Sequence, residues 1–198
     1  MIQSELLIAY GAVTKKLEKG EILFHQGDTA KFYFQVASGE MKMNNYNEEG
    51  KEFLQGIFSV GDSFGEPPLL IGEKYPANAE ALTNVELLAL PKDAFFEMQR
   101  KHPETAIAIS QRLAARLYYK AIMASEIASH DPEHRLLKLI DYFKEHVDPV
   151  AKNEKYYVRF TRQQLADLTG LRVETVIRSI KALEKKGELF IENRKVYR

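Results

Sequence analysis

The chain has 198 residues, with 28 basic and 28 acidic side chains and a formal net charge of zero. This length suits one large or two small globular domains. It contains no cysteine, which excludes disulfides, thiolate nucleophiles, cysteine-ligated iron–sulfur clusters and the usual structural zinc sites. No apolar run approaches ~20 residues, and the opening residues lack the features of a signal peptide, so we expect a cytoplasmic protein without a membrane span.

Charge is unevenly distributed along the chain. Residues 1–130 carry 13 basic and 17 acidic side chains, whereas residues 131–198 carry 15 and 11. A small basic domain beside a larger acidic one is typical of nucleic-acid-binding proteins, although a solvated lysine-rich surface gives the same balance. Charge alone leaves both interpretations open.

The first part of the chain has the pattern of an antiparallel β structure. Nine of the eleven glycines lie between Gly11 and Gly72. Short segments rich in aromatic and branched residues run between them, with strand character at 21–26, 31–43, 51–58 and 84–90. Such strands, separated by frequent turns, indicate an antiparallel barrel or sandwich. The polar stretch 44–51 is predicted as a hairpin tip.

Residues 103–130 contain no glycine and, after the first residue, no proline, which predicts a helix of about 26 residues, or ~39 Å. A stripe in alternating steps of four and three, as in a coiled coil, consists of Ala106, Ser110, Leu113, Leu117, Lys120, Ala124 and Ile127. A second apolar face is predicted at Ile107, Ile109 and Tyr118. Two apolar faces favour a homodimer formed through this helix, with packing inside one monomer as the alternative.

A change of organisation is predicted at Asp131-Pro132. Proline removes a backbone donor and disfavours helix in the preceding residue, so we interpret this dipeptide as an interdomain hinge. A helix at 133–147, a polar linker at 148–155 and a short strand at 156–160 are predicted to follow.

The stretch from residue 160 to residue 198 has the pattern of a winged helix-turn-helix. Thr161 and Gln164 form a capping box that opens a first helix, through residue 168, and Gly170 permits the turn after it. A second helix is predicted from 172 to 186, with a buried side at Val176, Ile180 and Leu183 and with Gly187 ending it. The last residues alternate as a hairpin that turns at Asn193-Arg194.

The solvent side of the second helix carries side chains suited to the major groove. Arg178 can donate two hydrogen bonds to guanine, and Glu174, one turn earlier, can accept one from cytosine. Phosphate contacts are predicted for Arg162, Lys185, Lys186, Arg194 and Lys195. The candidate DNA-binding residues are Thr161, Arg162, Gln163, Arg172, Val173, Glu174, Thr175, Arg178, Lys181, Arg194 and Lys195. The alternative is a protein-interaction module in which Glu174 and Arg178 form an i, i+4 pair.

Over nearly its whole length the sequence resembles the cyclic-AMP receptor/fumarate–nitrate regulator (CRP/FNR) family of bacterial transcription factors. Three segments carry the resemblance: VGDSFGEPPLL at 60–70, DPEHRLLKLI at 131–140 and TRQQLADLTGLRVETVIRSIKALEKKG at 161–187. It implies an α+β fold with an N-terminal antiparallel β-roll of the cyclic-nucleotide-binding jelly-roll type, a long dimerisation helix and a C-terminal winged helix-turn-helix. The implied domains are 1–102, 103–130 and 131–198, and the implied partners are double-stranded DNA, a second copy of the chain and RNA polymerase.

The resemblance also implies a DNA sequence. In the family, the residues at Glu174 and Arg178 read a C·G and a G·C pair. The cyclic-AMP branch carries an additional arginine where this chain has Val173, so we expect a TTGA-like rather than a GTGA-like palindrome. Arg172 stands where a serine or threonine cap is usual, so either the cap is lost or Arg172 reaches the backbone.

The same comparison argues against cyclic AMP as the effector. The family's pocket uses a Gly-Glu pair, matched by Gly65 and Glu66, and an Arg-Ser/Thr-Ala segment that grips the phosphate. That segment aligns with Pro76, Ala77 and Asn78, and the pair that meets adenine aligns with Lys120 and Ala121. The candidate effector residues are Gly65, Glu66, Pro67, Pro76, Ala77, Asn78, Lys120 and Ala121. Another small ligand in the same cavity and activity without any ligand both stay open.

Other chemistries have no support in the sequence. The five histidines show no ligand-like spacing, so we predict neither a haem nor a metal site. No Ser/His/Asp grouping, P-loop or HExxH motif occurs, so we predict no enzymatic activity. The alternative function from a different class is a small-molecule receptor that acts mainly through protein interaction.

Overall fold

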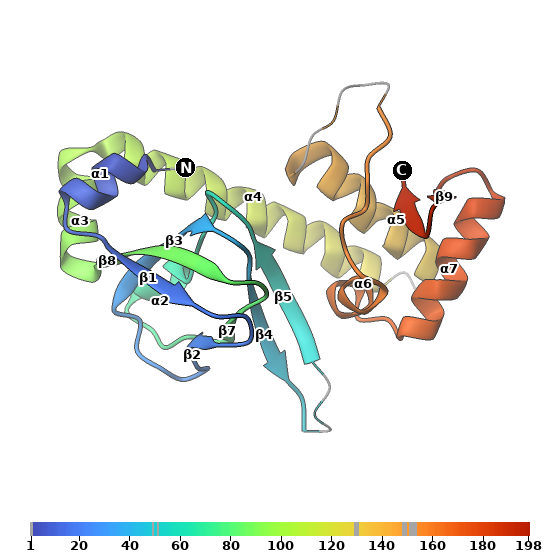
Figure 1. The fold of residues 1–198 in the computed structure, drawn as a ribbon, viewed down its shortest axis with the longest axis horizontal. Helices are drawn as coiled ribbons and strands as arrows, with labels where there is room; N and C mark the ends of the chain where they lie inside the picture. Colours follow the sequence, from blue (N-terminus) through green and yellow to red (C-terminus); the bar gives the residue numbers. More distant parts are fainter. Residues whose placement is uncertain (1, 49, 51, 129–130, 148–149, 151–153) are drawn as a thin grey trace. The chain divides into compact units, whose positions relative to one another are not determined.

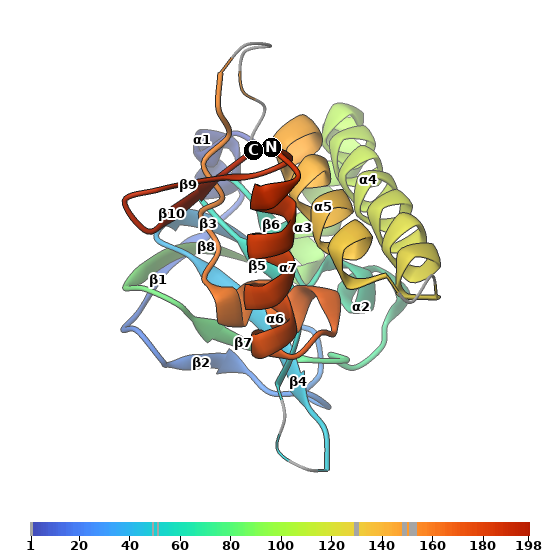
Figure 2. The ribbon, with the colours of Figure 1, turned by 90° about the vertical axis from the view of Figure 1, so that its right-hand side faces the viewer.

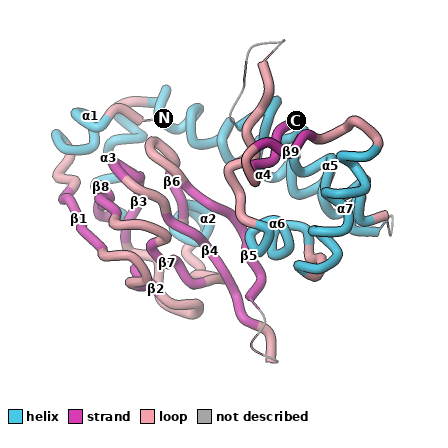
Figure 3. Tube along the Cα trace, turned by 45° about the vertical axis from the view of Figure 1, so that its right-hand side comes forward, coloured by secondary structure: helices cyan, strands magenta, loops and turns pink. Residues whose placement is uncertain are grey.

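The structure, a computed structural model, describes residues 2–48, 50, 52–128, 131–147, 150 and 154–198. It divides into two compact units, residues 1–113 and 114–198. The boundary falls inside the long helix α4, Pro103–Ala128. Figure 3 shows that strands dominate the first unit and helices the second, which confirms the predicted α+β class.

Two four-stranded antiparallel sheets form the N-terminal unit (Figure 1). One has the order β1-β8-β3-β6 and the other β2-β7-β4-β5. The strands are β1 Val13–Leu17, β2 Ile22–Phe24, β3 Phe32–Ser38, β4 Met41–Tyr46, β5 Glu52–Phe58, β6 Ser63–Phe64, β7 Asn78–Ala81 and β8 Val85–Pro91. The helices of this unit are α1 Ser4–Ala9, α2 Glu66–Ile71, α3 Lys92–Lys101 and the first part of α4. This is the predicted β-roll.

Strand β8 is buried on both of its faces. Its residues Leu87, Leu88, Ala89 and Leu90 are all buried, so both faces of this strand are covered. On one of them Tyr33 of β3, which pairs with Leu90, stacks on Phe95 of α3 with ring centroids 4.7 Å apart. A continuous apolar run is the expected pattern for a strand buried on both faces.

The predicted segment 31–43 is two strands rather than one. The chain turns at Gly39, whose φ of 79° lies in the left-handed region, and a Cβ there would overlap the backbone oxygen of Asn84. Only glycine meets both conditions. The predicted hairpin tip is also shorter than 44–51, because β4 continues to Tyr46, and residues 49 and 51 lie outside the described part of the chain.

Helix α4 is described as far as Ala128, and residues 129–130 of the predicted helix lie outside the described residues. Of the described seam side chains, Leu117 is 69% exposed and Lys120 is exposed, whereas Leu113 is half-buried. The prediction that Ile107, Ile109 and Tyr118 form one apolar face was wrong. Ile109 is buried, whereas the other two residues are exposed.

The second unit is helical and ends in a hairpin. Its elements are the rest of α4, α5 Pro132–Tyr142, a π-helical segment Phe143–Val147, α6 Arg162–Thr169, α7 Val173–Lys185, β9 Phe190–Glu192 and β10 Lys195–Tyr197. Asp131 caps α5, since its carboxylate accepts hydrogen bonds from the backbone N–H of Glu133 at 3.0 Å and of His134 at 3.4 Å. Most of the predicted linker, residues 148–149 and 151–153, lies outside the described residues.

Two predictions for this unit need correction. The helix expected at 133–147 is α-helical only to Tyr142 and then widens to a π-helix. Residues 156–160 form no regular strand. Tyr157 makes a single bridge to Tyr197, flanked by backbone hydrogen bonds such as that from the N–H of Val158 to the oxygen of Val196 at 2.9 Å.

Candidate DNA-binding surface

The first helix of the pair begins as the sequence predicts. The Thr161 hydroxyl accepts a hydrogen bond from the N–H of Gln164 at 3.1 Å, and the Gln164 side chain accepts one from the N–H of Thr161 at 2.8 Å. This capping box satisfies two backbone donors at the start of α6. Gly170, with a φ of 69°, ends α6 in the left-handed conformation and turns the chain toward α7.

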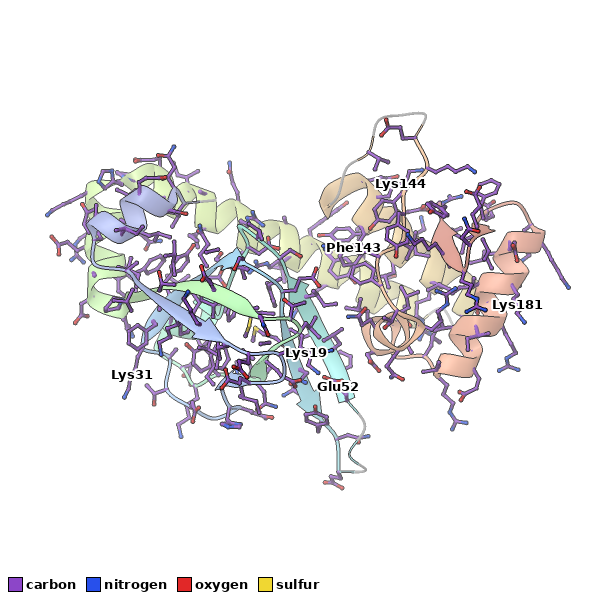
Figure 4. The ribbon with its side chains drawn as sticks, in the orientation of Figure 1. Lys19, Lys31, Glu52, Phe143, Lys144 and Lys181 are labelled. Atoms are coloured by element: carbon purple, nitrogen blue, oxygen red, sulfur yellow. The ribbon has the colours of Figure 1, made fainter. Side chains whose placement is uncertain are left out.

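Helix α7 packs against α5 and α6 (Figure 2). One of its faces is buried and the other is exposed. Val176, Ile180 and Leu183 are buried, as predicted. The exposed side carries Glu174, Ile177, Arg178 and Lys181, which recur at steps of three and one and therefore share a face. Lys181 is labelled on α7 in Figure 4. Val173 and Thr175 are half-buried.

Arg172 occupies the N-cap position of α7 with an extended backbone, and its side chain makes no capping hydrogen bond. The side-chain cap is therefore lost, one of the two outcomes expected from the sequence. The uncapped N–H groups at the start of α7 favour a negatively charged group near them.

The two predicted base readers are not paired with each other. Within the part of the chain that the structure describes, no ion pair engages Glu174 or Arg178, and the only polar side-chain contact of Arg178 is a long one of 3.5 Å from Nη2 to the Thr175 hydroxyl. The i, i+4 pair of the protein-interaction alternative is thus not formed. Both charged groups face solvent at the N-terminal half of α7.

The hairpin after α7 has the geometry of a tight wing. Asn193 and Arg194 have φ values of 50° and 65°, as a type I′ turn requires, and residues 190–192 pair with 195–197. Lys195 lies over the Tyr157 ring at 5.2 Å from its centroid. Arg198 joins the hairpin to the rest of the unit, since its Nε donates to Asp141 of α5 at 2.6 Å and its Nη1 to Glu188 at 2.7 Å.

The remaining predicted contacts fall into two groups. Arg162, Arg194, Lys185 and Lys195 engage in no ion pair among the described residues, and Gln163 is exposed while its amide donates to Asp167 at 2.9 Å. Lys186 differs, because its Nζ lies 2.6 Å from a carboxylate oxygen of Glu133, which also raises the pKa of Lys186. Lys186 is therefore already held in an ion pair within the protein.

In the N-terminal unit, several of the predicted effector residues are buried or hydrogen-bonded within the protein. Glu66 is fully buried and accepts a hydrogen bond from the Ser63 hydroxyl. Asn78 accepts one from the N–H of Gln26 at 2.9 Å, Ala77 is fully buried, and Pro67 and Pro76 are exposed. The segment 76–78 offers no guanidinium or hydroxyl group.

An aromatic pair that the sequence did not reveal covers Gly65. Tyr75, only 4% exposed, stacks on Phe24 at 3.6 Å between centroids, and its ring would lie 3.1 Å from a Cβ at Gly65. Burial, with the nearby carboxylates of Asp28 and Glu66, raises the pKa of Tyr75 to about 12. The indication in the sequence was that Tyr75 stands directly before residues 76–78, which align with the family's phosphate-binding segment.

A pocket of about 320 Å³ in the N-terminal unit is lined partly by Phe24 and Tyr75 and by none of the predicted effector residues. Lys120 and Ala121 lie exposed on α4 in the second unit. No group of three His, Asp or Glu side chains within the described ranges could hold a metal ion. Nor is any described helix long and apolar enough to cross a membrane.

The fold and this surface define a class: a DNA-binding regulator in which a β-roll precedes a winged helix-turn-helix. The cyclic nucleotide-binding domain family matches residues 14–102, and the Crp-like helix-turn-helix domain family matches residues 111–197. Together they account for most of the chain. The protein belongs to the CRP/FNR family of transcription regulators, which are not enzymes.

Individual relatives agree with this assignment. The global nitrogen regulator of Nostoc sp. is 25% identical over 191 residues, covering 95% of this chain and 86% of the relative. The cAMP-activated global transcriptional regulator CRP of Salmonella typhimurium is 26% identical over 166 residues, covering 83% and 79%. The structure of the c-di-GMP-responsive regulator CLP of Xanthomonas campestris aligns with a TM-score of 0.77 at 23% identity, covering 98% and 96%, which supports the fold.

Proposed function

We propose that the protein acts as a homodimer that binds a TTGA-like palindrome and recruits or blocks RNA polymerase. The observation that carries this proposal is the exposed face of α7, where Glu174 and Arg178 lie one turn apart with no ion-pair partner among the described residues. A guanidinium in this arrangement suits the guanine, and the carboxylate suits the cytosine, of the G·C pair in such a half-site. Since its proposed partner is chromosomal DNA, we expect it to act in the cytoplasm.

We assign the three proposed parts of the chain as residues 1–102 for an effector-like domain, 103–130 for dimerisation and 131–198 for DNA binding. The exposure of Leu117 and Tyr118 on α4 supports the second assignment, because large apolar side chains left in water by one chain can be buried by another. A two-fold symmetric dimer would present its two α7 helices to half-sites one helical turn apart.

We further propose that cyclic AMP is not required. An anionic phosphate held in a protein needs a charge-assisted donor, and Pro76, Ala77 and Asn78 supply none comparable to an arginine. The Tyr75 ring, stacked on Phe24 and packed against Gly65, also occupies space beside the Gly-Glu pair. A different small ligand and activity without a ligand are both compatible with this arrangement.

The test is fluorescence anisotropy of the purified protein without ligand. It is titrated onto a duplex carrying inverted TTGA half-sites ~10 bp apart, centre to centre, and onto a scrambled duplex, each with and without cyclic AMP. We expect specific binding that the nucleotide leaves unchanged. Preference for GTGA half-sites would contradict the sequence assignment, and a requirement for cyclic AMP would contradict the second proposal.

A further inference from the structure

Helix α7 carries an aliphatic side chain in the middle of its charged face. Ile177 is 41% exposed. The aliphatic residues on the buried face of α7 are at most 3% exposed; these are Val176, Ile180 and Leu183. Ile177 is therefore only partly covered by the rest of the unit. Its position is adjacent to Arg178 and three residues after Glu174, so it shares the face on which the proposed base readers lie.

An exposed aliphatic group on a major-groove helix has one base-specific partner. Among the four bases, only thymine presents a methyl group in the major groove, and apolar side chains recognise it by contact rather than by hydrogen bonds. Glu174 and Arg178 suit cytosine and guanine, so a side chain beside Arg178 faces the neighbouring base pair. In a TTGA half-site the pair before the guanine contains a thymine.

We propose that Ile177 is a specificity-determining residue that reads a thymine methyl group in each half-site. The inference rests on the proposed DNA-binding function and deepens it. Burial of the methyl group against Ile177 adds an apolar contact to the polar readout by Glu174 and Arg178. A half-site with cytosine or guanine at that position would then lose the contact even if the charged readers were satisfied.

The experiment removes the methyl group and nothing else. Each thymine of one TTGA half-site, on either strand, is replaced in turn by deoxyuridine, which keeps every hydrogen-bonding group of the base, and Kd is measured by anisotropy. For the unmodified protein we expect one replacement to weaken binding about fourfold, which corresponds to ~0.8 kcal/mol for one buried methyl group. The other replacements should have little effect.

Matched variants assign the effect to the side chain. Ile177→Ala should bind the thymine and uracil duplexes equally, while Ile177→Val should retain part of the difference. Phe190→Ala removes a similarly exposed apolar side chain of the same unit, 45% exposed on β9, and should keep the whole fourfold difference. Alanine is the better helix former, so Ile177→Ala is expected to fold, and its thermal unfolding serves as the check.

The outcomes separate the two proposals. Specific binding to TTGA that is insensitive to uracil at every position, or equally sensitive in Ile177→Ala, overturns the role of Ile177 and leaves the proposed function standing. Failure to distinguish the TTGA duplex from the scrambled one overturns the proposed function and this inference with it.

Discussion

At the scale of single residues, the proposed DNA interface divides into side chains that read bases and side chains that hold phosphates. The two kinds predict different consequences of substitution. Arg178→Ala should weaken binding to the preferred duplex by ~1–3 kcal/mol and relax the preference at one G·C pair, because the bidentate contact discriminates between bases. Competition anisotropy with duplexes changed at that pair measures both effects.

Lys195→Ala is the matched control for this prediction. Lys195 lies on the wing and engages in no ion pair within the described part of the chain, so we expect its loss to weaken binding to specific and scrambled duplexes about equally. If Lys195→Ala changed base preference while Arg178→Ala did not, the proposed division between readers and phosphate contacts would be reversed.

Lys120 provides a second prediction at this scale. It stands at a seam position of α4 and is exposed in the single chain. An ammonium group that is buried without a partner destabilises a dimer interface. Lys120→Leu should therefore strengthen dimerisation by roughly 1.5–3 kcal/mol, the free energy gained by burying one leucine side chain. Sedimentation over a dilution series measures the change. A weaker dimer would mean that Lys120 pairs with an anionic group, either from the partner or from a ligand.

At the scale of elements, the start of α6 carries the clearest energetic prediction. The capping box consists of two hydrogen bonds at an exposed helix end, one accepted by the Thr161 hydroxyl and one by the Gln164 side chain. Thr161→Ala should lower the free energy of unfolding of the second unit by ~0.5–2 kcal/mol, whereas Thr161→Ser, which keeps the hydroxyl group, should preserve most of it. Chemical denaturation followed by circular dichroism compares the three proteins. Equal stability of the alanine and serine variants would contradict the role of the Thr161 hydroxyl group as a helix cap.

The same scale shows which features the sequence could predict. The capping box at Thr161, the helix stop at Gly170 and the turn at Asn193-Arg194 were predictable, because each depends on residues three or four apart. The change from α-helix to π-helix at Phe143 was not. There, Tyr142 stacks on Tyr119 of α4 at 4.0 Å, and Phe143 meets Phe160 at 4.5 Å, contacts between residues far apart in the chain.

The candidate site shows the same division. The buried and exposed faces of α7 follow from helical periodicity, which places Glu174 and Arg178 on the exposed face, and their side-chain chemistry then suggests base reading. Ile177 was not predicted, because only charged and polar side chains of the exposed face were considered for base contacts, apart from Val173. Tyr75 was overlooked for another reason: its burial on Phe24 and Gly65 joins three separate segments of the β-roll.

At the scale of the whole molecule, the uneven distribution of charge along the sequence bears on how the protein is attracted to DNA. The chain is neutral overall, so long-range attraction cannot come from its net charge. The attraction must come from local cations of the second unit. Among the described residues, four of these cations are not held in ion pairs: Arg162, Lys185, Arg194 and Lys195. Lys186, in contrast, is paired with Glu133. A symmetric dimer doubles each of these contributions.

The salt dependence of binding tests this arrangement. Eight phosphate contacts, four from each subunit, predict a slope of about −7 in a plot of log K against log salt concentration, at about −0.9 for each neutralised phosphate. Lys195→Ala removes two contacts per dimer and should make the slope about 2 units less negative. Lys186→Ala should change it little, because Glu133 already neutralises that cation, and Lys19→Ala in the N-terminal unit should not change it (Figure 4). A flat salt dependence would instead favour a protein-interaction surface, since such a surface releases no counterions from DNA.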